Sequence, residues 1–270
     1  MLLGICDRLR DQWRCFVVRT GRRLRLLFFL WACSVFADLA EVNAQESDMF
    51  IKTIETIKQA IAPVACTYPT SQRTAEVGAT NGTAFFIDTH GVFLTASHVI
   101  SGFLQGVKYD DCVPSVYVPI DGWSVKKLKL QALRFVPSDC RLDETTDLAR
   151  CRTVDDPTGI GNIVSKPTAL TIENDVQPDG TQVAFSGFPL NGLIPYTARA
   201  SIAGYQAAEI RLNQDLQVSQ VVLDKAAWPG ASGGPVYRLD GRVIGMVLQT
   251  GAGLAFARHG ARINDFLSAP

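Results

Sequence analysis

Short runs of apolar and β-branched residues, each ended by a turn, follow one another through most of this chain. The first three are "GTAFFID" (82–88), "VFLTA" (92–96) and "SVYVPI" (115–120). Further strands are expected at 124–136, 147–154, 168–172, 181–187, 197–206, 217–224, 234–239, 242–249 and 253–257. Many short strands separated by turns, with no regular alternation of strand and helix, predict an all-β sandwich or barrel.

Two local patterns organise these strands. Residues 147–154 are expected to pair with 131–136 as a hairpin, and Asp240-Gly241 is a hairpin turn between two later strands. A stretch rich in Gly, Pro and polar residues, 155–168, then interrupts the strands and is typical of a linker. The chain is therefore expected to have two similar halves, 64–160 and 161–270.

A helix is expected before the first half, within residues 45–63. Phe50, Ile54 and Ile57 recur at helical spacing, and Ile61 continues the same apolar stripe. Pro63 is expected to end this helix. The tail "HGARINDFLSA" predicts a short C-terminal helix after the last strand.

The first 44 residues differ from the rest of the chain. Seven arginines precede an apolar run from Leu26 to Ala37, and Val42-Asn43-Ala44 offers small or apolar residues at a cleavage position. This layout predicts a signal peptide over residues 1–44, and hence an exported protein that is periplasmic or secreted. The apolar run is about half the length of a membrane-spanning helix. The alternative is an uncleaved membrane anchor, and after cleavage no stable membrane span is expected.

Composition narrows the possible partners. Hydrophobic residues make up 47% of the chain and charged residues 19%, which favours a packed globular protein over a disordered one. The formal net charge is zero, and no dense basic stripe suggests nucleic acid as a partner. The oligomeric state stays open.

Four cysteines remain after removal of the predicted signal peptide: Cys66, Cys112, Cys140 and Cys151. An even number suits an oxidising compartment, and no CxxC spacing suggests a zinc site. We expect neither a metal nor a cofactor. Cys140 and Cys151 lie on either side of Asp147 in a predicted hairpin, so we expect them to form a disulfide. Cys66 and Cys112 are left to pair or to stay free.

The stretch "PGASGGPV" (229–236) places Ser232 between glycines. One interpretation is the nucleophile elbow of α/β hydrolases, which needs a helix after the serine and then an acid and a histidine. Here Pro235 and a predicted hairpin follow instead. A Ser232–Asp240–His259 triad would have to fit within that hairpin and the tail. We reject this interpretation and expect His259, like His90 in its predicted turn, to be a surface residue.

The second interpretation uses residues upstream of the serine. "FLTASHVI" (93–100) presents His98 at the end of a strand, and "TTDLARC" (145–151) presents Asp147 at the start of another. A serine hydroxyl becomes a good nucleophile when an imidazole takes its proton, and a buried carboxylate holds that imidazole in one tautomer. The order His98, Asp147, Ser232 therefore predicts a catalytic triad.

With these stretches the chain resembles trypsin-like serine peptidases of the chymotrypsin fold, most of all bacterial Deg-type (heat-shock) proteases. The resemblance rests on "NGTAFFID", "FLTASHVI", "TTDLAR", "GASGGPV", "LDGRVIGM" and "GLAFAR", which together span residues 81–258. It implies two six-stranded antiparallel β-barrels with the active site in the cleft between them. His98 and Asp147 would lie on the first barrel and Ser232 on the second. No PDZ module is expected.

The resemblance also implies how substrate would bind. The Gly230 and Ser232 N–H groups would form the oxyanion hole, and a protein or peptide would be the substrate. The pocket for the residue before the scissile bond would be walled by Ala226, Ala227, Leu248, Gln249 and Thr250. No carboxylate stands among them, so we expect small or medium apolar residues rather than Lys or Arg.

The residue before the serine also differs from many animal members of this family. They carry an aspartate there, which pairs with a newly cut N-terminal amine, whereas this chain has Ala231. Activity without a second cleavage is therefore expected. Two functions stay open at this point: an exported serine endopeptidase, and a binding or scaffold protein on the same fold with an idle triad.

Overall fold

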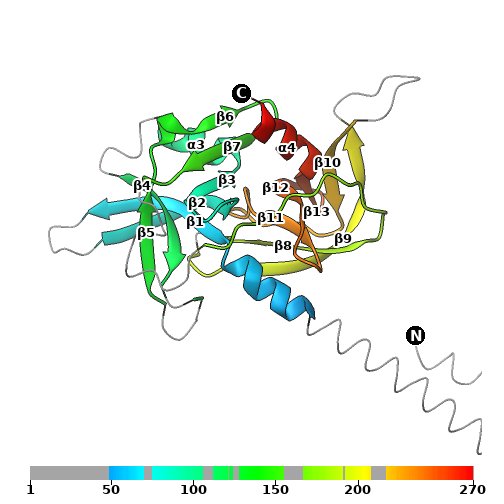
Figure 1. The fold of residues 1–270 in the computed structure, drawn as a ribbon, viewed down its shortest axis with the longest axis horizontal. Helices are drawn as coiled ribbons and strands as arrows, with labels where there is room; N and C mark the ends of the chain where they lie inside the picture. The colour runs from blue at the N-terminus through cyan, green and yellow to red at the C-terminus, as the bar shows by residue number, and fades with distance from the viewer. Residues whose placement is uncertain are drawn as a thin grey trace, which may run out of the picture. The chain divides into compact units, whose positions relative to one another are not determined.

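The computed structural model describes residues 49–69, 75–105, 112–120, 122–123, 128–154, 167–190, 192–207 and 217–269 (Figure 1). The predicted signal peptide, residues 1–44, and most of the predicted linker, residues 155–166, lie outside these ranges. Residues 50–270 form one compact unit. Nearly all of its regular structure is β, which confirms the predicted class.

The first half is an antiparallel sheet of seven strands in the order β5-β4-β1-β2-β3-β7-β6. Their bounds are β1 Ile61–Pro69, β2 Ala75–Phe86, β3 Val92–Thr95, β4 Val113–Pro119, β5 Leu130–Arg134, β6 Arg141–Asp143 and β7 Leu148–Arg152. An isolated bridge between Phe135 and Thr153, just past β5 and β7, brings the two sides of the sheet together. Six strands thus curve into the predicted barrel shape, and the short β6 is added at the edge of β7.

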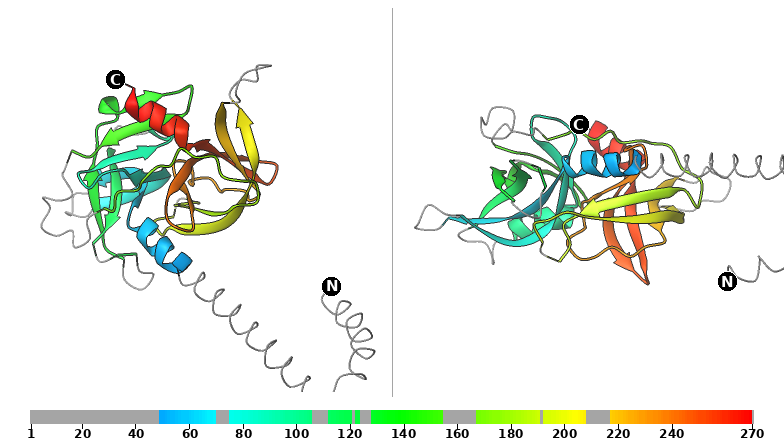
Figure 2. Two further views of the ribbon diagram at one scale, coloured as in Figure 1. Left: turned by 45° about the vertical axis from the view of Figure 1, so that its right-hand side comes forward. Right: turned by 90° about the horizontal axis from the view of Figure 1, so that it is seen from below.

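The second half is a closed barrel of six strands in the order β10-β13-β12-β11-β8-β9. Their bounds are β8 Gln182–Gly187, β9 Tyr196–Ala207, β10 Val218–Leu223, β11 Pro235–Arg238, β12 Val243–Gly251 and β13 Leu254–His259. The predicted hairpin turn at Asp240-Gly241 joins β11 to β12, and Gly241 has the positive φ of 87° that such a turn favours. Figure 2 shows the two β lobes side by side.

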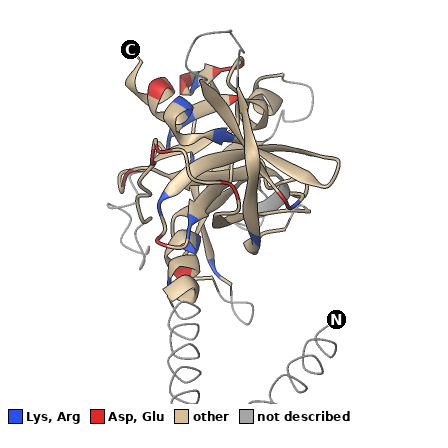
Figure 3. Cartoon of the chain, turned by 90° about the vertical axis from the view of Figure 1, so that its right-hand side faces the viewer, with Lys and Arg blue, Asp and Glu red and all other residues tan. Residues whose placement is uncertain are grey.

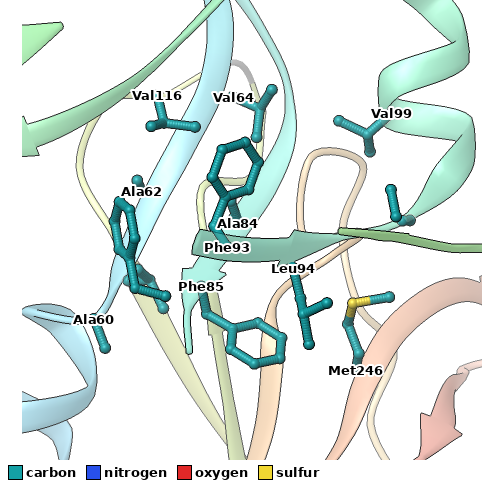
Figure 4. Packing of buried hydrophobic residues seen from close by; sticks show 14 of the residues in the cluster. Ala60, Ala62, Val64, Ala84, Phe85, Phe93, Leu94, Val99, Val116 and Met246 are labelled. Atoms are coloured by element: carbon teal, nitrogen blue, oxygen red, sulfur yellow. The ribbon is translucent and has the colours of Figure 1, made fainter. Parts of the chain in front are cut away.

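The apolar core of the first half continues into the second. It gathers Phe85, Phe93 and Leu94 from β2 and β3, and it includes Met246 of β12 (Figure 4). A separate cluster of buried apolar side chains, among them Phe185, Val221 and Val247, fills the second barrel. Because one core includes side chains from both halves, residues of the two halves lie close together at their junction.

Among the described residues, three α-helices and one short 3-10 helix, η1 (Pro137–Asp139), accompany the sheets. Residues 49–58 are helical, α3 spans Ser97–Leu104, and α4 spans Gly260–Ser268. The C-terminal helix was predicted, but α3 was not, because its few residues follow directly on a strand. No helix among the described residues is long and apolar enough to cross a membrane.

The N-terminal helix ends earlier than predicted. It stops at residue 58, and β1 begins at Ile61 with Pro63 inside it. Proline is tolerated at this point because β1 pairs there with β2 alone, through Pro63 and Thr83, while pairing with β4 begins at Val64. The apolar stripe predicted as one helix is thus divided: Phe50, Ile54 and Ile57 lie in the helix, and Ile61 begins β1.

Two strand predictions are also wrong. Strand β7 pairs with β3 and β6 rather than with 131–136. The two predicted ranges meet just past β7, through the bridge from Phe135 to Thr153 and the bond from the Val154 N–H to the Arg134 carbonyl at 2.7 Å. The predicted strand 168–172 is irregular apart from a bridge at Ile172. An apolar run alone does not reveal which strand will be its neighbour.

Both cysteine pairs form disulfides. Cys140 is joined to Cys151, as predicted, and Cys66 to Cys112, which settles the open alternative. Both lie in the first half, and the second half contains no cysteine. In Figure 3 basic and acidic residues are interspersed over the elements that face the viewer.

Candidate active site

His98 and Asp147 are in direct contact. The Nδ1 atom of His98 lies 2.8 Å from Asp147 Oδ2, and the backbone N–H of His98 donates to Oδ1 at 3.0 Å. The Ser97 hydroxyl donates to the same Oδ1 at 2.8 Å. All three groups lie in the first turn of α3, whose N-terminus favours a negative charge. The carboxylate thus holds the imidazole through Nδ1, and among the described residues no hydrogen bond involves Nε2.

These contacts set the charge of the carboxylate. Burial of the Asp147 carboxyl acts to raise its pKa, but the bonds from His98 and Ser97 outweigh burial and hold the pKa below its usual value. Asp147 is therefore ionised at neutral pH. Half of the His98 side chain is exposed, whereas the Asp147 side chain is only a quarter exposed.

The backbone before Asp147 is folded tightly. Asp143 accepts bonds from the N–H groups of Thr145 and Thr146 and from the Thr146 hydroxyl. Asp147 itself has φ = 56°, a left-handed conformation that aspartate tolerates better than most residues. This turn aims the carboxylate back toward α3 just before β7 begins.

Arg258 supports this turn from the other half of the molecule. It lies on β13, is only 8% exposed, and donates from Nε to the Thr146 carbonyl oxygen at 2.7 Å. Burial lowers the pKa of its guanidinium, while the charges of Asp147 and Asp143 act in the opposite direction. The second barrel thus contacts the loop that carries Asp147.

Ser232 lies in a loop packed against the first half. The Ser232 carbonyl accepts the Thr83 N–H at 2.8 Å. A Cβ atom on Gly233 would collide with the Thr83 carbonyl and the Thr95 hydroxyl, and it would lie 3.1 Å from the Ala96 nitrogen. Ala96 is the N-cap residue of α3, two positions before His98. Gly233 therefore brings the serine loop against the turn that carries the histidine.

The Ser232 hydroxyl points to a strand rather than to the histidine. It donates to the Leu248 carbonyl on β12 at 2.9 Å. Among the described residues, no hydrogen bond joins it to His98. The structure therefore brings together two members of the predicted triad, His98 and Asp147, and holds the third in a different side-chain orientation.

The two predicted oxyanion donors are unpaired among the described residues. Neither the Gly230 N–H nor the Ser232 N–H has a hydrogen-bond acceptor among the described residues, although their neighbours Ala231 and Gly233 both do. Gly230 has φ = 93°, which glycine adopts readily. Two unpaired donors at Gly230 and at Ser232 itself are groups suited to bind a negatively charged oxygen.

The predicted pocket residues lie on two sides of Ser232. Leu248 contacts the serine through its carbonyl, and Gln249 and Thr250 follow it as exposed residues of β12. Ala226 is partly buried, while Ala227 packs in the core of the second barrel. The structure brings Leu248 to the serine, but it encloses the Ala227 side chain.

His259 is not the surface residue that the sequence predicted. It is 2% exposed, and its Nδ1 accepts the Ala261 N–H at 3.3 Å, which caps α4. Burial lowers the pKa of its imidazole. The apolar strand β13 extends to His259, so the side chain points into the protein. His90 is exposed in its turn, as predicted.

Three residues around the site were missed from the sequence. Thr83, Ser97 and Arg258 all lie within stretches that carried the resemblance, but no role was given to their side chains. Their signal was weak, since a single Thr, Ser or Arg beside a motif is common. Only the folded arrangement shows that they contact the loops carrying Ser232 and Asp147.

Comparison with known proteins identifies the family. Residues 82–246 match the family model described as "Trypsin-like peptidase domain". The chain is 30% identical over 183 residues to the proteins named serine protease HTRA2, mitochondrial, of Drosophila virilis and Drosophila erecta. Each match covers 67% of this chain and 37% of the relative, so the chain spans little more than a third of their length.

Among solved structures, the active form of the Rv3671c protease from M. tuberculosis is similar in fold. The TM-score is 0.54 at 17% identity, over 80% of this chain and 82% of the other. The family match and the Drosophila relatives confirm the predicted resemblance, and the likeness to the Rv3671c protease shows a shared fold. The chain belongs to the trypsin-like peptidase family.

Proposed function

We propose that this protein is an exported serine endopeptidase that cleaves peptide bonds through His98, Asp147 and Ser232. The observation that carries the proposal is the contact between His98 and an ionised Asp147 next to a serine loop with two unpaired N–H groups. A histidine held by a carboxylate is a general base, and the unpaired donors can bind the oxyanion that acyl transfer creates.

The reaction begins with a rotation of the Ser232 side chain. The hydroxyl leaves the Leu248 carbonyl for another staggered χ1 position, which directs it toward His98 Nε2. As Ser232 Oγ attacks the substrate carbonyl carbon, its proton passes to His98, and the imidazolium is stabilised by Asp147. The same proton then moves to the leaving amine, and water releases the acyl group by the reverse sequence.

Substrate choice follows from the residues around the serine. We propose that the residue before the scissile bond lies among Ala226, Leu248, Gln249 and Thr250. No acidic side chain stands among them, so a lysine or arginine would be desolvated without a partner. Small and medium apolar residues are expected. A peptide library cleaved mainly after Lys or Arg would contradict this expectation.

The compartment and the route to activity belong to the same proposal. Two disulfides favour an oxidising environment, in line with the signal peptide predicted at 1–44. Ala231 is buried among apolar side chains, and its N–H already bonds to the Trp228 carbonyl. A charged N-terminus would gain no partner there, so residues 45–270 are expected to be active even with a short N-terminal extension.

The deciding experiment treats residues 45–270 with a fluorophosphonate probe and assays hydrolysis of a peptide library. The wild-type protein should be labelled at Ser232, and Ser232→Ala should lower kcat by about 10⁶-fold. Ser138→Ala, at an exposed position of the first half, serves as the control. Hydrolysis that persists at the wild-type rate in Ser232→Ala would refute the assignment.

A second function is favoured by one observation. The Ser232 hydroxyl bonds to Leu248 instead of His98, as expected of an idle triad on a binding or scaffold protein. Absence of both labelling and hydrolysis in folded wild-type protein would support this alternative. Labelling at Ser232 excludes it, because the reaction needs an activated hydroxyl.

A further inference from the structure

We propose that Thr83, on β2 of the first half, is a positioning residue that holds the loop 229–233 with the Gly230 and Ser232 N–H groups open to the substrate. The inference rests on the proposed function, since it assigns a residue that prepares the oxyanion site. Thr83 does not touch the reacting atoms. It acts on them through backbone groups of the loop.

The first step of the argument is the orientation of each peptide group in the loop. In a trans peptide the C=O and N–H point in opposite directions, so a bond to one fixes the direction of the other. The Pro229 carbonyl accepts the Leu190 N–H at 2.8 Å, and the Ala231 carbonyl accepts the Gly234 N–H at 2.9 Å. The N–H groups of Gly230 and Ser232, on the far sides of these peptides, are consequently directed away and left unpaired.

The second step concerns the Gly230–Ala231 and Ser232–Gly233 peptides, which Thr83 holds. The Thr83 hydroxyl donates to the Gly230 carbonyl at 2.8 Å, and the Thr83 N–H donates to the Ser232 carbonyl at 2.8 Å. All four carbonyls from Pro229 to Ser232 are therefore bonded, two of them by Thr83. Among the described residues, the Thr83 hydroxyl is the one side-chain group that bonds to these carbonyls.

The third step is that Thr83 is itself firmly placed. It is completely buried, and its carbonyl accepts the Thr95 hydroxyl at 2.7 Å. Its own Oγ1 accepts the Phe188 N–H at 2.9 Å, which leaves the single hydroxyl proton for Gly230. A Cβ on Gly187 would lie 2.8 Å from this oxygen, so the absence of a side chain there makes the space.

Loss of the hydroxyl would release the loop at a glycine. Gly230 has the conformational freedom of glycine, and its partly buried carbonyl would be left unpaired, as would the buried Phe188 N–H. The Gly230–Ala231 peptide could then turn toward another partner. A turn of this peptide would move the Gly230 N–H away from the substrate oxygen while leaving Ser232, His98 and Asp147 chemically intact.

The test compares Thr83→Val, which has the same shape without the hydroxyl, with Thr83→Ser, which keeps it. Thr83→Val should lower kcat about 10- to 100-fold with KM changed less than about threefold, since loss of an oxyanion donor costs about 10²- to 10³-fold. Thr83→Ser should stay within about threefold of wild type. Fluorophosphonate labelling rates should follow kcat.

Thr53→Val is the matched control. The Thr53 hydroxyl also donates to a backbone carbonyl distant from it in sequence, that of Leu239 at 2.7 Å, which lies beyond β11 and outside the loop 229–233. It should lower the melting temperature without lowering kcat. If Thr83→Val is recovered unfolded, Thr83→Cys replaces it, because a thiol is a weak donor of similar size.

Three results would overturn the inference: wild-type kcat in the variant that lacks the hydroxyl, an equal loss of kcat in Thr83→Ser, or an equal loss in Thr53→Val. Each of these results counts against the inference only if the wild-type protein hydrolyses peptides and Ser232→Ala does not. If wild type lacks that hydrolysis, the proposed function itself fails, so the two failures are distinguishable.

Discussion

The two sides of the candidate active site are built by different means. On the first half, Asp147 is bonded by the His98 ring, the His98 N–H and the Ser97 hydroxyl, so side-chain identity determines the geometry. On the second half, the loop around Ser232 is held almost entirely through backbone carbonyls, and its glycines leave room for close packing. Substitutions on the two sides should therefore fail in different ways.

The scaffolds beneath these two sides differ as well. The second half is a closed barrel, so each strand edge is paired by hydrogen bonds to a neighbouring strand. It contains no cysteine. The first half is joined across its open side by a single isolated bridge and is cross-linked by two disulfides. Covalent links supply a constraint where the sheet pairing is incomplete.

Replacing the charge on the first side should have the largest effect of these changes. Asp147→Asn keeps the size of the side chain but removes the acceptor that holds the His98 tautomer, so kcat should fall about 10⁴-fold. Asp139→Asn, on an exposed carboxylate of the same half, is the control and should leave kcat unchanged. Steady-state kinetics would decide, and a fall of less than tenfold would show that Asp147 does not orient the histidine.

Removing the disulfides should separate stability from catalysis. Cys140→Ala with Cys151→Ala opens a link of sequence separation 11, which should lower the free energy of unfolding by roughly 3 kcal/mol. Cys66→Ala with Cys112→Ala opens a separation of 46 and should cost about 1 kcal/mol more.

The two disulfides should rank in the opposite order in their effect on kcat: the one whose removal costs less stability should affect catalysis more. The link from Cys140 to Cys151 closes the hairpin that carries Asp147, so its removal should lower kcat. The other link lies at the far end of the sheet, between β1 and the start of β4, and should leave kcat unchanged. Denaturant unfolding and kinetics at 10 °C measure both quantities. Equal kcat values for the two double variants would contradict a role for the hairpin.

Ser97→Ala tests the side-chain support of the carboxylate alone. It removes one of the bonds to Asp147 Oδ1 and leaves both bonds from His98 in place, so kcat should fall about threefold to tenfold. Ser101→Ala, also on α3 but outside the contact with Asp147, is the matched control. An effect as large as that of Asp147→Asn would mean that Ser97 determines the position of the whole turn.

The same contrast explains what could be predicted from the sequence. Strand runs, the hairpin turn and the short motifs around His98, Asp147 and Ser232 are local patterns, and such patterns can be recognised in a single sequence. Strand partners were harder: β7 pairs with β3 and with the three-residue strand β6, which is too short to show an alternating pattern, and not with the longer apolar run at 131–136. The predicted end of the first helix was wrong because the apolar residues before Pro63 suit a helix or a strand.

Contacts between the halves were the least predictable part of the site. Thr83 and Arg258 act on loops that lie far from them along the chain, at Gly230 and Thr146. The Ser232 side-chain orientation depends on the Leu248 carbonyl, a backbone atom with no sequence signature. Residue types can indicate a triad, whereas the orientation of the Ser232 hydroxyl relative to His98 depends on how the loops pack.

The smallest effect should come from His259, which is buried on the second side. Its imidazole has a lowered pKa in the folded protein because burial opposes the charged form. Below a pH of about 6.5 the unfolded chain therefore binds a proton more readily than the folded one, and stability falls as the pH falls. His259→Asn keeps a side-chain oxygen to cap α4 and removes this titration. Urea unfolding at pH 7.5 and pH 5 should show a smaller loss of stability in the variant than in wild type. Equal losses would show that protonation of His259 does not contribute to acid destabilisation.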